Sequence, residues 1–94
     1  MKAIISERAL STIDSIARFV ESQNTKGSGA RYALKFKEAI KKLAIPNVQY
    51  TLCNHKVFLE SDYSCSHFND WVIAFRIDGN KLVVYEIVHG SLLA

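Results

Sequence analysis

WVIAFRIDGNKLVVYEIVH, residues 71–89, is the stretch of sequence that decides the fold. Two apolar runs, rich in β-branched and aromatic residues, flank a Gly79-Asn80 pair, which is a strong signal of a β-hairpin. With these two residues as the loop, Asp78 lies opposite Lys81. The sequence therefore predicts that the chain ends in two long antiparallel strands.

Counting outward from this turn places Asp70 directly opposite His89. Side chains alternate between the two faces of a sheet and cross-strand partners share a face, so Asp70, Arg76, Tyr85 and His89 are predicted to point the same way. A loop at 78–79 keeps Asp70 and His89 on one face, whereas a three-residue loop separates them. A carboxylate, an imidazole and a guanidinium on one face are groups that suit acid-base chemistry on a phosphodiester.

Both faces of the hairpin are apolar, which indicates that one packs on the core and the other is covered by a partner. The first predicted set is Trp71, Ile73, Phe75 and Val84, and the second is Val72, Ala74, Val83 and Ile87.

The size and composition of the chain are those of one small globular domain, residues 1–94. Of its 94 residues 49% are hydrophobic and 22% charged, and the formal net charge is +3. This charge gives a mild bias toward nucleic acid or an acidic partner protein. No apolar run approaches the roughly 20 residues of a membrane span, and the N-terminus lacks the order of a signal peptide. We expect a cytoplasmic protein, no membrane association, and reduced thiols at Cys53 and Cys65.

The first half of the chain predicts a strand followed by two helices. Residues 2–5 form a short apolar run, and Ser6 can cap the helix that follows. The buried stripe of this helix is predicted to be Leu10, Ile13, Ile16, Ala17 and Val20. Residues 23–29 are polar and read as a loop. A second helix is predicted over residues 30–44, with Tyr32, Phe36, Ile40 and Leu43 as its buried stripe and Pro46 ending it.

After the proline the pattern changes to period two, which predicts strands at residues 48–52 and 56–60. Residues 61–66 are polar and are expected to be irregular. The predicted order is β-α-α-β-β-β with an optional extra strand. This is an α+β fold in which an N-terminal αα-hairpin packs on one face of a mainly antiparallel sheet.

This order, with these residues, resembles the RelE/ParE superfamily of type II toxin–antitoxin toxins over most of the chain. The front half, from Ile4 through Ala9 into the helical hairpin, is similar to the ParE branch. The back half resembles the YafQ branch in its His67, its Asp70-Trp71 pair and its terminal His89-Gly-Ser-Leu. An upstream histidine of that branch falls on His55. The gap from His67 to Asp70 is shorter than in the pattern, and a terminal aromatic residue is missing.

The resemblance to the YafQ branch implies metal-independent RNA cleavage. A general base must take the 2′-hydroxyl proton, an acid must protonate the leaving oxygen, and cations must stabilise the transition state. Four residues are candidates for catalysis: His55 and His67 for proton transfer and positioning, and Asp70 with His89 as an acid-base pair.

Three further residues are candidates for binding the substrate. Arg76 can grip phosphate oxygens with two parallel donors, Lys56 is a weaker phosphate contact, and Trp71 can stack on a base. The plain structural interpretations are that Trp71 lies in the core, that Arg76 pairs with Asp78 or Glu86, and that the lysines of the second helix form a solvated face.

The leading prediction is a toxin that acts as a ribosome-dependent mRNA endoribonuclease without a cofactor. Its partners would be the ribosome, mRNA and a cognate antitoxin that folds on binding. The alternatives are a non-enzymatic ParE-like toxin that poisons DNA gyrase and a catalytically inactive relative.

A Cys-x-His unit occurs twice, at Cys53-Asn-His55 and Cys65-Ser-His67. On extended strands these two units could supply four zinc ligands, but their spacing is not one of the common zinc signatures. The default interpretation is buried free cysteines beside unrelated histidines, so the sequence predicts no metal.

Overall fold

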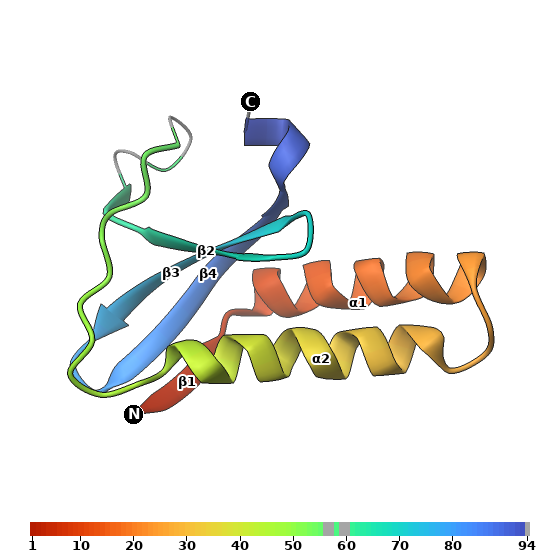
Figure 1. Ribbon diagram of the computed structural model, residues 1–94, viewed down its shortest axis with the longest axis horizontal. Helices are drawn as coiled ribbons and strands as arrows, with labels where there is room; N and C mark the ends of the chain where they lie inside the picture. Colours follow the sequence, from red (N-terminus) through yellow and green to blue (C-terminus); the bar gives the residue numbers. More distant parts are fainter. Residues whose placement is uncertain (56–57, 59–60, 94) are drawn as a thin grey trace.

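The computed structural model describes residues 1–55, 58 and 61–93. The chain runs through β1 (Lys2–Ile5), α1 (Glu7–Gln23), α2 (Ser28–Leu43), β2 (Ser64–Phe68), β3 (Trp71–Asp78), β4 (Lys81–His89) and a terminal 3-10 turn, η2 (Gly90–Leu93). Figure 1 shows the two helices lying side by side beneath the sheet.

The four strands form one mixed sheet in the order β1-β4-β3-β2. β1 is parallel to β4, and the other two pairings are antiparallel. The predicted α+β fold with β-α-α-β-β-β order is therefore confirmed. The end of the α1–α2 hairpin that carries the interhelical loop extends beyond the sheet, past the β2–β3 turn (Figure 1). We call the helix surface at this end the ledge.

The helices begin and end for identifiable reasons. Ser6 caps α1 as predicted, with its hydroxyl accepting a hydrogen bond from the Ala9 amide at 3.1 Å. α2 starts at Ser28, two residues earlier than predicted, although its N-cap Gly27 has no side chain to cap it. The carboxylate of Glu21 from α1 takes that role, because it accepts hydrogen bonds from the amides of Gly27 and Gly29, both at 2.8 Å.

The main core lies between the helices and one face of the sheet. Ile13 of α1 and Phe36 of α2 pack there against Phe75 of β3 and Val84 of β4, all fully buried. A smaller cluster covers the opposite face of the sheet, where Phe58 lies near Ala74. Of the predicted α1 stripe, Ile13 and Ile16 are buried, whereas Leu10 remains 36% exposed.

The strand predictions between the helices and the hairpin are wrong where the structure describes them. Residues 48–52 form no strand, and Leu52 makes one isolated bridge to Ser64. The predicted strand at 56–60 lies outside the described residues except for Phe58, which is buried. β2 instead begins inside the stretch expected to be irregular. Its polar sequence SCSHF carries little strand signal, and its pairing with β3 supplies the stability that local propensity does not.

None of the helices in the described ranges combines the length and the apolar character needed to cross a membrane.

Candidate functional site

A β-bulge in the terminal hairpin changes the predicted register. From the turn outward the pairing is as expected, with Asp78 opposite Lys81 and Phe75 opposite Val84, but Ala74 then pairs with Glu86. β4 thus carries one extra residue at the bulge. Beyond it every partner is displaced by one, so Trp71, and not Asp70, lies opposite His89. The predicted Asp70–His89 pairing is wrong for this reason.

The shift also moves side chains to the other face of the sheet. Ile87 pairs with Ile73 and belongs to the helix-facing core, whereas the sequence placed it with Val72 and Ala74. Because Trp71 packs against this same core, its partner His89 lies on the helix-facing side. The predicted common face for His89 with Arg76 and Tyr85 is therefore not formed.

His89 is held in place by Trp71 and by the residues that follow it. The Trp71 and His89 rings meet edge to face, with centroids 5.0 Å apart. The Ser91 amide donates to Nδ1 of His89 at 3.2 Å, and the Ser91 hydroxyl lies 2.8 Å from the same nitrogen. Since an amide N–H can only donate, Nδ1 is the acceptor and the proton of the neutral ring lies on Nε2. The imidazole thus presents an Nε2–H donor.

Asp70 lies in the tight turn between β2 and β3 and contacts the end of β4 through its backbone. Its carbonyl oxygen accepts a hydrogen bond from the Gly90 amide at 2.7 Å. This bond fastens the turn to the segment that carries His89. It joins the two predicted partners through main-chain atoms, while the imidazole bonds to Ser91.

His55 and His67 lie together on the other face of the sheet. His67 pairs with Val72, so it points away from the helices, and its ring centroid is 6.5 Å from that of His55. The two rings line a cavity of about 220 Å³. Cys53 and Cys65 line the same cavity and form a disulfide, so the prediction of reduced thiols is wrong for this structure.

The backbone explains why these two cysteines meet. The Cys53 amide donates to the carbonyl of Tyr63 at 2.7 Å, and Leu52 bridges to Ser64 in antiparallel fashion. This short pairing folds the loop after α2 back along β2. Sequence spacing alone could not show it, because the described residues 48–52 form no regular strand.

Arg76 belongs to a polar cluster at the turn end of the hairpin. Its Nε donates to Asp78 at 3.2 Å, and its guanidinium carbon lies 5.3 Å from the centroid of the Tyr85 ring. The Tyr85 hydroxyl donates to the other Asp78 oxygen at 2.9 Å, and this ring stacks on Tyr63. The hydrogen bond to Asp78, more than partial burial, raises the pKa of Tyr85, and the Asp78 charge raises the pKa of Arg76. The expected pairing of Arg76 with an acidic neighbour is confirmed.

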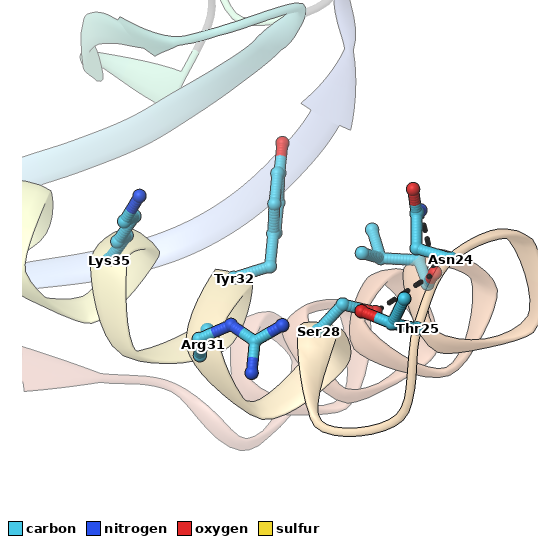
Figure 2. A pocket seen from close by; sticks show the side chains of 7 residues that line it. Asn24, Thr25, Ser28, Arg31, Tyr32 and Lys35 are labelled. Carbon is cyan, nitrogen blue, oxygen red and sulfur yellow. Dashed lines mark hydrogen bonds between the residues drawn. The ribbon is translucent and has the colours of Figure 1, made fainter.

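The helical ledge carries a basic cavity that the sequence analysis did not single out. It has a volume of about 470 Å³, and its charged lining residues are Arg31 and Lys35. Figure 2 shows the Tyr32 and Lys35 side chains pointing up from α2 and the Arg31 side chain lower, beside Ser28. The available signal was the i, i+4 spacing of two cations near the start of α2. Asn69 of the β2–β3 turn donates to the Tyr32 hydroxyl at 3.1 Å, which places this turn beside the cavity.

An apolar cavity of about 310 Å³ lies on α1, where Ile16 and Phe19 face Trp71. Phe19 is 66% exposed, whereas Trp71 is half-buried against the core. The expectation that Trp71 is a core residue fits this position. Lys56, the remaining candidate, lies outside the described residues.

The comparison with known families gives the decisive observation. The family described as "ParE toxin of type II toxin-antitoxin system, parDE" has a sequence model that matches residues 3–92. The chain belongs to the ParE toxin family. This membership confirms the RelE/ParE resemblance and makes the protein a toxin of a type II system, with an antitoxin as its partner. A search of curated proteins finds no match to this toxin.

Proposed function

We propose that this toxin arrests growth by binding an essential protein, with DNA gyrase as the target, and that it does not cut RNA. The observation that carries this proposal is that the predicted Asp70–His89 acid-base pair is not formed, because Trp71 lies opposite His89. His67 lies on the face away from the helices, and His89 lies on the helix-facing side. RNA cleavage needs an acid and a base that both reach one phosphodiester.

Arg76, the candidate cation for binding phosphate, already has interaction partners. Arg76 forms an ion pair with Asp78 and lies over the ring of Tyr85, so a phosphate would have to displace an existing carboxylate. A pair of this kind on an exposed sheet surface is a weak anion site, because the nearby negative charge opposes a second one.

The ledge of the helical hairpin supplies a surface suited to a protein target. Among the described residues that line its cavity, the charged ones are Arg31 and Lys35, and the Glu21 carboxylate lies close enough to Arg31 for their charges to interact. With a net charge of +3, the toxin complements an acidic protein surface, and such complementarity raises the association rate and the specificity of binding. We place the main contact with the target on this ledge.

Two sets of variants test the proposal. Asp70→Ala combined with His89→Ala should leave growth arrest and gyrase inhibition intact. Arg31→Glu combined with Lys35→Glu should weaken inhibition of gyrase-driven supercoiling at least tenfold. The matched control is Lys41→Glu with Lys42→Glu, the same charge change in the last turn of α2, and it should change little. Loss of arrest in the folded Asp70/His89 variant, with unaltered gyrase, would refute the proposal.

The second candidate function is ribosome-dependent cleavage of mRNA. The specific observation that favours it is the placement of His55 and His67 in one cavity, with centroids 6.5 Å apart. Two imidazoles at this separation can share a phosphodiester as acid and base. Primer extension on transcripts from a cell-free translation system distinguishes the two functions. New ends that need ribosomes and vanish in His55→Ala and His67→Ala would establish cleavage.

A further inference from the structure

We propose that reduction of the Cys53–Cys65 disulfide converts the cavity beneath it into a zinc site with Cys53, His55, Cys65 and His67 as ligands. The two Cys-x-His units lie 12 residues apart, and the fold brings all four side chains to the lining of one cavity of about 220 Å³. This site lies apart from the basic ledge, so the proposal does not depend on which target the toxin binds.

The separation within the cysteine pair and that within the histidine pair are both compatible with tetrahedral coordination. With Zn–S bonds of about 2.3 Å and Zn–N bonds of about 2.0–2.1 Å, two thiolates lie nearly 4 Å apart and two imidazole centroids about 5 Å apart. The Cα atoms of the two cysteines are 5.1 Å apart, and the two ring centroids are 6.5 Å apart. Bringing the two rings together by about 1.5 Å is a displacement that rotation of the histidine side chains can supply.

Backbone contacts position the ligands in addition to the disulfide. Cys65 and His67 are two residues apart on β2, so both project from the face that lies away from the helices. Cys53 lies opposite them, where its amide donates a hydrogen bond to the Tyr63 carbonyl at 2.7 Å. The His55 carbonyl accepts a hydrogen bond from the Phe58 amide, and the Phe58 side chain is buried in a cluster with Cys53 and Ala74.

The oxidised form does not bind metal in this way, because each sulfur is bonded to the other. The part of the chain that the structure describes holds no group of three or more metal-ligating side chains as it stands. The conversion needs a dithiol reductant, which becomes a disulfide as Cys53 and Cys65 each gain one electron and one proton. Binding of Zn²⁺ then releases the two thiol protons and forms two Zn–S and two Zn–N bonds.

The disulfide of the oxidised chain and the zinc ion of the reduced chain would each connect the loop after α2 to the sheet. The cytoplasm expected from the sequence supplies dithiols, so the zinc form is the one we expect in the cell. Zinc also occupies the imidazoles of His55 and His67, which withdraws both from proton transfer.

The test is a metal titration of the full chain, with Co²⁺ as the spectroscopic probe and Zn²⁺ as its competitor. The protein is reduced with a dithiol, desalted without oxygen, and titrated. We expect one Co²⁺ per chain, with thiolate charge-transfer absorption and the strong d–d bands of a tetrahedral site, displaced by one Zn²⁺. The disulfide form should bind at least 100-fold more weakly. His55→Ala and His67→Ala, which keep both thiols, should each weaken binding tenfold or more.

His89→Ala is the matched control, because His89 lies on the other side of the sheet. It should bind Co²⁺ as tightly as the unchanged chain. Circular dichroism on each sample shows whether the reduced chain is folded before and after the metal is added. Three results would each overturn the proposal: a reduced chain that binds no Co²⁺, folded or not; equal binding by the two forms; and histidine variants that bind like the parent.

Discussion

Replacing Gly29 with alanine tests the close approach of the two helices on which the ledge depends. Gly29 is buried at the start of α2, and a Cβ atom built on it would lie 2.3 Å from the carbonyl oxygen of Ala17 in α1. Ordinary van der Waals contact begins near 3.4 Å, so backbone atoms would have to separate by about 1 Å. No flexible side chain can absorb this displacement, because the obstructing atom belongs to the backbone.

The expected cost follows from two opposing effects. Overpacking of this kind destabilises by about 1–3 kcal/mol. The gain in helix propensity on replacing glycine with alanine offsets up to about 1 kcal/mol. We therefore expect Gly29→Ala to lower the free energy of unfolding by about 1–2 kcal/mol, which corresponds to a Tm lower by roughly 5–15 °C for a domain of this size.

The assay is thermal and urea unfolding followed by circular dichroism, with the redox state of the cysteines held constant. The control is Ala30→Gly at the exposed neighbouring position, where propensity is the main effect and destabilisation of up to about 1 kcal/mol is expected. If propensity alone governed both sites, Gly29→Ala would raise the Tm. An unchanged or higher Tm would refute the close packing of α1 on α2.

Three further predictions follow from the hydrogen bonds of single side chains. Asp78→Ala should lower the pKa of Tyr85 toward its ordinary value, seen in an ultraviolet titration with Tyr85→Phe as reference, because the raised pKa comes first from the bond to Asp78. Two amide hydrogen bonds lower the pKa of Glu21, so its contribution to stability is present above its ordinary value of 4.5 and is lost as the pH falls through the folded pKa. In Glu21→Gln the urea midpoint should therefore depend less on pH over that acid range. An identical pH dependence in the variant and the parent would contradict this. Ser6→Ala should cost about 1 kcal/mol in urea unfolding through loss of the α1 cap, and no loss would show that the cap is dispensable.

The elements with strong local signals were predictable from the sequence. The Gly79-Asn80 turn set the correct pairing of Asp78 with Lys81, and the 3.6-residue periodicity located both helices. Ser6 was identified as the cap of α1 from its residue type and place alone. These signals act within a few residues, so a single sequence contains them in full.

The candidate site was less predictable because it depends on register. One extra residue in β4, at the bulge near Tyr85, is enough to move His89 to the opposite face from that expected. No residue at the bulge is a glycine or proline that would mark it. A count from the turn therefore fails beyond this point, although it is correct up to Phe75.

The cysteines and β2 were misjudged for a related reason. Ser64–Phe68 becomes a strand through its pairing with β3, and the disulfide depends on a loop that folds back along that strand. Both are contacts between distant parts of the chain. Local propensity does not report such contacts, and the cellular compartment expected from the sequence argued for free thiols.

The most direct test of the account is to add the purified toxin to DNA gyrase and relaxed plasmid DNA, and in parallel to a ribosome-programmed mRNA. We predict inhibition of supercoiling, retained when Asp70 and His89 are both alanine and lost when Arg31 and Lys35 are both glutamate, with the mRNA left intact. Unimpaired gyrase, together with new mRNA ends that require ribosomes, would contradict the proposal that this toxin acts by binding.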